Sequence, residues 1–131
     1  MDPAQLLKNL HWYLAALNPS KLNPTGVHDG DTVDAVIDMG GFIYIHKSIR
    51  VANVNAPELA NPDGSGKAAR DWAQGWFKGF CPIGQFFIHT HLDPSDKYGR
   101  FLAMIYAPNG ACFNDDIVAA GHAVPFEVEP Y

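Results

Sequence analysis

The chain has 131 residues, of which 47% are hydrophobic and 18% charged, and these proportions predict one globular domain and exclude a long disordered chain. No apolar stretch approaches the ~18 residues that a membrane-spanning helix needs, so no membrane segment is expected. The formal net charge of −5 disfavours tight, non-specific binding of nucleic acid, although a local basic cleft could still contact phosphate.

Residues 1–26 are predicted to form a helix and a linker that precede the main domain. Asp2 can cap this helix, Pro3 suits its first position, and apolar side chains recur at helical spacing over residues 6–17. Two Asn-Pro pairs within residues 18–26 end the helix and form the linker. We expect the apolar face of the helix to pack on the following domain or to mediate self-association, with a separate partner as the alternative.

The start of the chain lacks the pattern of a secretory signal. Asp2 stands where a basic residue is usual, and Lys8 interrupts the apolar segment. A cytoplasmic location is therefore expected, and with it reduced thiols at Cys81 and Cys112 rather than a disulfide.

After residue 26 the hydrophobic pattern changes to the alternation of β-strands. Apolar and polar residues alternate over 33–39 and again over 43–51, and Gly40-Gly41 between them predicts a tight hairpin turn. Two more strands are predicted over 85–92 and 101–107.

Two further helices are predicted in the second half of the chain. The first runs from about Ser65 to Gly79, and its wide aromatic face is expected to form core rather than to stack on bases. The second begins near Asn114 as its cap and ends near Gly121. Contiguous strands with helices set apart favour an α+β fold with a small barrel.

Polar residues suited to phosphate chemistry gather in three clusters. They are Asp-Gly-Asp-Thr at 29–32, Arg50 with Asn-Ala-Pro-Glu at 55–58, and Asp-Lys-Tyr-Gly-Arg at 96–100. Arginine binds phosphate through two parallel hydrogen bonds, and Arg50 lies in an apolar strand where an unpaired charge is unfavourable. A structural ion pair of Arg50 with Glu58 or an aspartate is the alternative.

These clusters, in this order, resemble the staphylococcal nuclease family over about residues 27–126. The resemblance implies that residues 27–131 form a five-stranded OB-fold β-barrel of the α+β class, with about three helices when the extra N-terminal helix is included. It also implies an endonuclease that uses Ca²⁺, with Mg²⁺ or another divalent ion as the alternative, to hydrolyse phosphodiester bonds of DNA or RNA.

The resemblance further implies a role for each matching residue. Glu58 would act as general base on the attacking water, and Arg50 and Arg100 would stabilise the charge of the transition state. The other implied roles are metal binding by Asp31, Asn55 and the main-chain carbonyl of Ala56, and substrate binding by Lys97, Tyr98 and Phe126.

Asn55 departs from the family, which usually has aspartate at this position. An asparagine keeps an oxygen ligand but removes one negative charge, so weaker metal binding is expected. Together with the acidic net charge, Asn55 supports an alternative function, a catalytically weak or inactive barrel that binds nucleic acid or protein.

Overall fold

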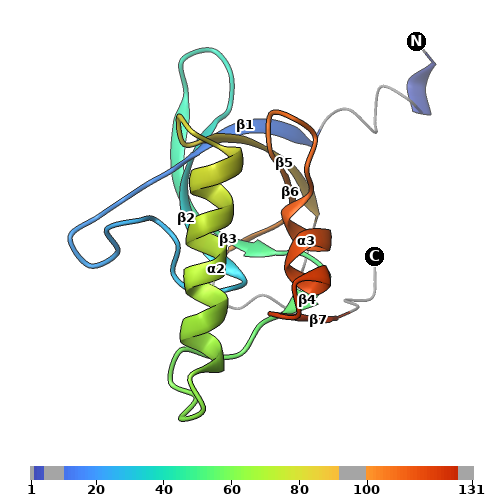
Figure 1. The fold of residues 1–131 in the computed structure, drawn as a ribbon. Helices are drawn as coiled ribbons and strands as arrows, with labels where there is room; N and C mark the ends of the chain where they lie inside the picture. Colours follow the sequence, from blue (N-terminus) through green and yellow to red (C-terminus); the bar gives the residue numbers. More distant parts are fainter. Residues whose placement is uncertain (1, 5–10, 92–99, 127–131) are drawn as a thin grey trace.

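The computed structural model describes residues 2–4, 11–91 and 100–126, and the architecture below concerns these residues. Strands close into a barrel in the order β1-β2-β3-β6-β5, and helices α2 and α3 pack against it (Figure 1). No helix within these ranges is long and apolar enough to cross a membrane. The elements are β1 (Trp12–Leu17), β2 (Thr32–Asp38), β3 (Tyr44–Val51), β4 (Val54–Asn55), α2 (Ser65–Phe80), β5 (Gln85–His91), β6 (Phe101–Tyr106), α3 (Phe113–Ala119) and β7 (Val124–Pro125).

The five-stranded OB-fold barrel of the α+β class is thereby confirmed, but the N-terminal helix is wrong for residues 12–17. These residues form β1, which pairs antiparallel with both β2 and β5 and so belongs to the barrel. Their apolar side chains fit a strand as well as a helix, and Ala15 points inward at 2% exposure. Residues 12–17 form a strand rather than a helix because they pair along both of their edges. Without β1, one edge of β2 and one edge of β5 would lack hydrogen-bond partners. Residues 5–10 of the predicted helix lie outside the described part of the chain.

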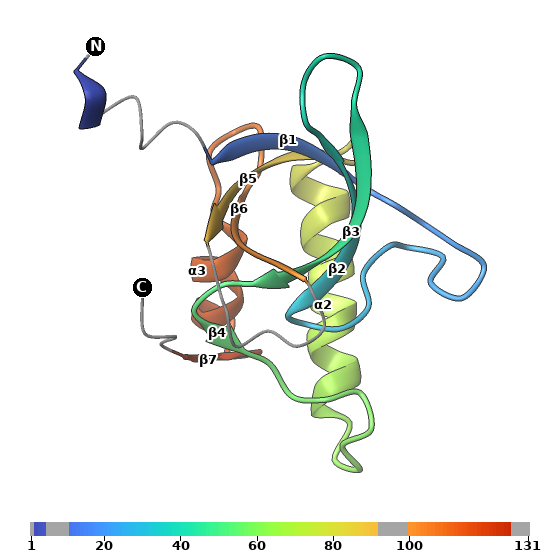
Figure 2. The same ribbon diagram turned by 180° about the vertical axis from the view of Figure 1, so that it is seen from behind.

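The predicted hairpin is confirmed as β2 and β3. Val33, Ala35 and Ile37 point into the barrel and are at most 1% exposed, as the alternation of the sequence predicts. Gly40 and Gly41 at the tip have φ angles of 83° and 61°, which glycine adopts without steric cost. The hairpin extends beyond the barrel in both views (Figures 1 and 2).

The barrel closes through a parallel pairing between β3 and β6. Its register runs from Ile49 opposite Phe101 to Val51 opposite Ala103. The pairing therefore involves the last three residues of β3, which include Arg50. Figure 2 shows β3 crossing to meet β6 on the far side of the barrel from α2. This pairing is non-local, so no short segment of the sequence predicts it.

Aromatic rings join the two helices to the barrel. The ring of Phe77 in α2 lies 5.2 Å from that of Phe86 in β5 and 5.4 Å from that of Phe113 in α3. Trp76 packs edge-on against Phe113 at 5.2 Å and donates a hydrogen bond of 2.8 Å to Asp116. The aromatic face of the predicted helix is therefore core, as expected.

Asn114 does not cap the last helix, which corrects the sequence-based assignment. The N-cap is Cys112, and Asn114 is 2% exposed within α3. Its Oδ1 accepts a hydrogen bond of 2.9 Å from the Ile105 amide, and its Nδ2 donates one of 2.7 Å to the Ala52 carbonyl. The side chain thus joins α3 to β6 and to the turn between β3 and β4. Gly121, with a φ of 81°, ends the helix as predicted.

Both cysteines are free thiols, in line with the sequence-based expectation. Burial raises the pKa of Cys81 to about 11 and also raises the pKa of Cys112. The reactive thiolate is therefore scarce at neutral pH at both positions.

We expect Asn114→Ala to lower the free energy of unfolding by about 2–3 kcal/mol, because it leaves a buried amide and a buried carbonyl without partners. Urea unfolding followed by tryptophan fluorescence measures the change. Asn61→Ala, in an exposed turn, is the control and should change stability by no more than about 0.5 kcal/mol. An equal effect of the two substitutions would contradict the structural role of Asn114.

Candidate functional site

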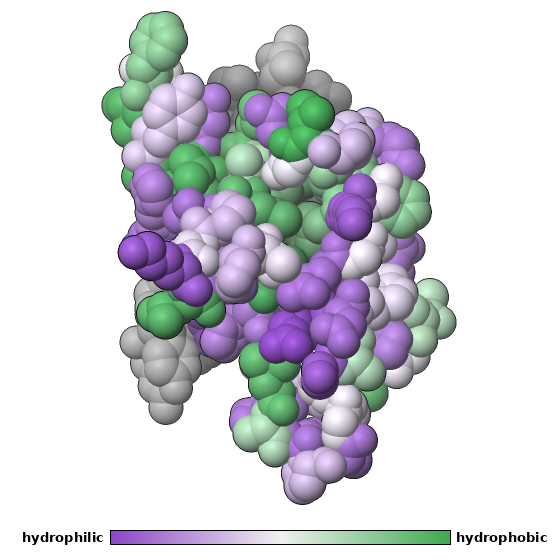
Figure 3. Space-filling view, turned by 60° about the vertical axis from the view of Figure 1, so that its left-hand side comes forward, coloured by the Kyte–Doolittle hydropathy of each residue, from purple (hydrophilic) through white to green (hydrophobic). Residues whose placement is uncertain are grey.

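A cleft with a volume of about 820 Å³ lies beside β2, β3 and the segment between β4 and α2. Figure 3 shows the side of the molecule that lies to the left in Figure 1, and hydrophilic residues gather across the middle of this side. The cleft brings together the predicted catalytic and metal-binding residues, which are Asp31, Arg50, Asn55, Ala56, Glu58 and Arg100.

The predicted substrate-binding residues are placed differently. Lys97 and Tyr98 lie outside the described residues. Phe126 is 48% exposed and does not line the cleft. Its backbone amide donates a hydrogen bond of 2.8 Å to the Asn53 carbonyl, which continues the pairing of β4 with β7.

Asp31, immediately before β2, is held by contacts with three parts of the chain. Its Oδ2 accepts a hydrogen bond of 2.9 Å from the Ala56 amide, and its Oδ1 accepts one of 3.3 Å from the Thr32 hydroxyl. Its main-chain carbonyl accepts a hydrogen bond of 2.8 Å from the Val51 amide. The carboxylate is therefore fixed at the junction of β2, the end of β3 and the segment after β4.

Asp29 adds a second carboxylate to this junction. Its Oδ1 accepts a hydrogen bond of 3.0 Å from the Asp31 amide. Burial, reinforced by the neighbouring Asp31 carboxylate, raises the pKa of Asp29 to about 6. The sequence analysis assigned Asp29 no role, although the Asp-Gly-Asp spacing was the signal that could have identified it.

Arg50 reaches Asp31 from the neighbouring strand. It lies opposite Thr32 in the β2–β3 register, and its Nη2 is 3.5 Å from the Asp31 Oδ2. Its Nη1 donates a hydrogen bond of 2.8 Å to the Val51 carbonyl. The ion pair that the sequence left open is therefore with Asp31, and the 18% exposed side chain of Arg50 still lines the cleft.

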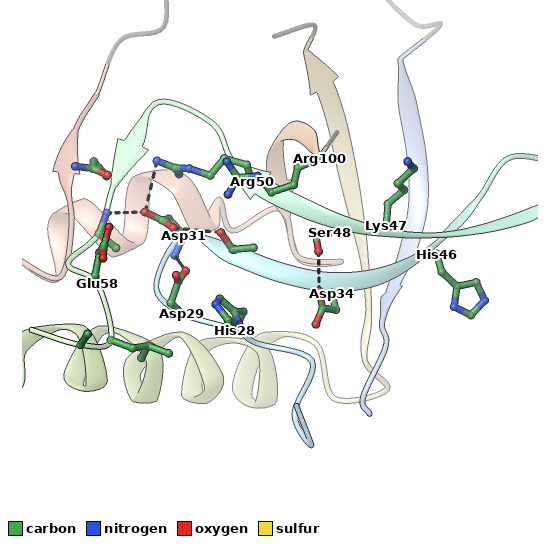
Figure 4. Close-up of a pocket in the computed structure, with 15 residues that line it drawn as sticks. His28, Asp29, Asp31, Asp34, His46, Lys47, Ser48, Arg50, Glu58 and Arg100 are labelled. Atoms are coloured by element: carbon green, nitrogen blue, oxygen red, sulfur yellow. Dashed lines mark hydrogen bonds and ion pairs between the residues drawn. The ribbon is translucent and has the colours of Figure 1, made fainter. Parts of the chain in front are cut away.

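Arg100 is brought to the same place by the parallel pairing of β3 with β6. It directly precedes Phe101, which lies opposite Ile49 in the register. The close-up shows the side chains of Arg50 and Arg100 near one another beside Asp31 (Figure 4). Two guanidinium groups 50 positions apart in the sequence thus line one cleft.

Two glycines that the sequence analysis did not single out allow this close packing. At Gly66, in the first turn of α2, a Cβ would overlap the main-chain carbonyl of Glu58. At Gly30, a Cβ would lie 2.8 Å from the Ala56 Cβ and 2.9 Å from the Ala69 Cβ. The segments that carry Asp31 and Glu58 can therefore approach α2 only because no side chain intervenes.

The oxygen donors of the cleft suit a hard divalent cation such as Ca²⁺ or Mg²⁺. An ionised carboxylate accepts at about four positions, and the hydrogen bonds from Ala56 and Thr32 and the ion pair with Arg50 leave room on the Asp31 carboxylate for a metal ion. Within residues 2–4, 11–91 and 100–126, no group of three or more His, Cys, Asp or Glu side chains could hold a metal. Fewer than three such side chains are therefore available to a metal ion here, which favours weak affinity.

The fold and the cleft define a small OB-fold protein with a carboxylate–arginine centre. The chain belongs to the staphylococcal nuclease family, because the family profile described as staphylococcal nuclease homologue matches residues 48–130. It is also 33% identical, over 101 residues, to two curated proteins named uncharacterized endonuclease, one from Escherichia coli O157:H7 and one from Escherichia coli. These matches cover 77% of this chain and 58% of each relative, so the chain spans little more than half the length of these relatives.

We expect Gly66→Ala to destabilise the protein by about 2–3 kcal/mol, because the new methyl group would displace the Glu58 backbone. Gly75→Ala is the matched control on the same helix, since nothing lies within 4 Å of its Cβ position. The control should raise stability by about 0.5–1 kcal/mol through higher helix propensity. Thermal unfolding of both variants checks the prediction, and a stable Gly66→Ala variant would refute the close approach.

Proposed function

We propose that this protein is a divalent-metal-dependent nuclease that hydrolyses phosphodiester bonds of DNA or RNA, with Ca²⁺ as the expected metal. One observation carries the proposal: separate segments of the chain bring two carboxylates and two arginines to one cleft. A structural ion pair would need only Asp31 and Arg50. The names of the two bacterial relatives support the same chemistry. The four residues are Asp31, Arg50, Glu58 and Arg100.

In the proposed reaction Glu58 acts as the general base. Its side chain is exposed at the cleft, where water can reach it, and it takes a proton from the attacking water. The water oxygen forms a bond to phosphorus, the bond to the 5′ oxygen breaks, and that oxygen leaves with a proton from solvent. The product carries a 3′-phosphate, as the resemblance to the family implies.

Arg50 and Arg100 bind the scissile phosphate and stabilise the negative charge that develops on its oxygens. The contacts of Arg50 with Asp31 and Val51 orient the guanidinium before substrate binds. A divalent cation held by Asp31, Asn55 and the Ala56 carbonyl would supply positive charge at a phosphoryl oxygen.

Substrate contacts beyond the scissile phosphate are proposed for three residues. Lys97 and Tyr98 would contact the neighbouring phosphate and base. The exposed ring of Phe126 offers a surface for base stacking.

We expect cleavage of single-stranded DNA or RNA that requires metal and stops in EDTA. Glu58→Gln should lower the rate about 10²- to 10⁴-fold because the base is lost, and Arg50→Ala about 10²- to 10³-fold because charge stabilisation is lost. Gel assays in Ca²⁺, Mg²⁺ and EDTA, with circular dichroism to verify folding, measure these effects. Arg70→Ala is the matched control, because Arg70 pairs with Asp71 and does not line the cleft.

Cleavage that persists in the Glu58→Gln and Arg50→Ala variants would indicate a contaminant or another site. A folded protein that cleaves neither substrate in either metal would refute the nuclease. That result would favour the second candidate function, a binding module, which the acidic net charge and Asn55 support.

Asn55→Asp separates the two candidates. If Asn55 limits metal binding, the added carboxylate should raise Ca²⁺ affinity by about tenfold and increase the cleavage rate at low Ca²⁺. Isothermal titration with Ca²⁺ gives the affinity independently of activity. An unchanged affinity would show that Asn55 is not a metal ligand.

A further inference from the structure

The cleft continues along one face of β3 beyond the proposed catalytic centre. Side chains alternate along a strand, so Arg50, Ser48 and His46 share one face of β3, and all three line the cleft. Lys47 lies opposite the inward-facing Ala35 and belongs to the other face. The close-up shows this division, because His46 and Ser48 point to one side of β3 and Lys47 points to the other (Figure 4). The surface that continues from Arg50 is therefore made by Ser48 and His46.

A depression with a volume of about 240 Å³ continues this face away from Arg50. The segment after β1 contributes Asn18 and Ser20 to it, and β2 and β3 contribute Asp34, His46 and Ser48. The volume equals that of about eight water molecules at ~30 Å³ each, and a nucleobase has about that many heavy atoms. The depression therefore suits one planar base better than a whole nucleotide.

Asp34 holds the floor of the depression in place. Its Oδ1 accepts a hydrogen bond of 2.8 Å from the Ser48 hydroxyl, and its Oδ2 accepts one of 2.9 Å from the Asn23 side-chain amide. Because Lys47 belongs to the other face of β3, no lysine or arginine among the described lining residues faces the depression. A carboxylate without a neighbouring cation repels a phosphate, whereas the N–H groups of a nucleobase are compatible with it.

His46 and Asn18 offer contacts that suit a base. The Nδ2 of Asn18 lies 3.1 Å from the Nδ1 of His46. An amide nitrogen only donates, so Asn18 orients the imidazole, whose Nε2 keeps a proton to donate. His46 is exposed, and its ring is a planar surface on which a base can stack. Ser20 adds a hydroxyl, which suits the polar edge of a base with its donors and acceptors.

We propose that this depression is a base subsite, which binds one unpaired nucleobase of a single-stranded substrate, stacked on His46 with its polar edge toward Asn18 and Ser20. This inference rests on the proposed function, because that function places the scissile phosphate at Arg50. Arg50 and His46 are four residues apart on one strand, a distance of ~13 Å. The base therefore belongs to a nucleotide beyond the two that flank the scissile bond. In a double-stranded substrate the base would be paired and could not enter the depression.

The first test measures binding without cleavage. Fluorescence anisotropy in EDTA gives the affinity for a fluorescein-labelled single-stranded DNA octanucleotide and for an abasic chain of the same length, which keeps every phosphate but has no bases. His46→Ala should weaken binding of the octanucleotide about tenfold, because one stacked base is lost, and leave the abasic chain unchanged. Asn18→Ala should show the same selectivity. His91→Ala is the matched control, because His91 is an exposed histidine on β5 that lines neither the cleft nor the depression.

The second test locates the base relative to the scissile bond. It compares kcat/KM for a dinucleoside monophosphate, whose two bases flank that bond, and for the octanucleotide. His46→Ala should lower the value for the octanucleotide about tenfold and leave the value for the dinucleotide unchanged, because only the longer substrate reaches the depression. An equal decrease for both substrates would place His46 at the scissile bond and overturn the separate subsite.

The two tests separate this subsite from the nuclease. A loss of affinity in His46→Ala that depends on the bases, in a protein that cleaves neither substrate, would support the subsite and refute the catalytic proposal. An equal loss for the octanucleotide and the abasic chain, or no loss for either, would overturn the subsite and leave the catalytic proposal unaffected. An octanucleotide that binds no more tightly than the abasic chain would also overturn the subsite.

Discussion

The hydrogen bond from the Ala56 amide to the Asp31 carboxylate, 2.9 Å long, is the contact on which the cleft depends. Asp31 is also joined to the end of β3 through the Val51 amide, so one residue connects two strands and the segment that leads to Glu58. Without this junction that segment would lack a fixed position relative to the barrel, and Arg50 would lose its carboxylate partner. The 8% exposure of Asp31 makes each lost contact costly, since a partly buried carboxylate needs its donors.

The second constraint is the position of β3 between an antiparallel and a parallel neighbour. Its pairing with β2 places Arg50 beside Asp31, and its pairing with β6 brings Arg100 to the same cleft. On the other side of β2, β1 closes the barrel by joining β2 to β5. The strand that the sequence suggested was a helix therefore completes the barrel, although it contributes none of the proposed catalytic residues.

Local charge, rather than net charge, describes the surface that a substrate would meet. The chain is acidic overall, but Arg50, Arg100 and Lys47 all line the cleft, and two of the chain's three arginines are among them. Asp29 and Asp31 are withdrawn into the junction behind them, where hydrogen bonds hold both carboxylates. Asp34 and the exposed Glu58 line the same cleft, so a phosphodiester here would meet acidic as well as basic side chains.

The sequence by itself determined the features that depend on neighbouring residues: the β2–β3 hairpin, the apolar face of α2 and the motifs that hold Asp31, Arg50 and Glu58. Periodicity and motif order are local properties, so they can be read without knowing the fold. Only the tertiary structure decided that residues 12–17 are a strand and that Asn114 is a buried link rather than a cap. An asparagine near the start of a helix looks the same in both roles, and only the partners across space, Ile105 and Ala52, distinguish them.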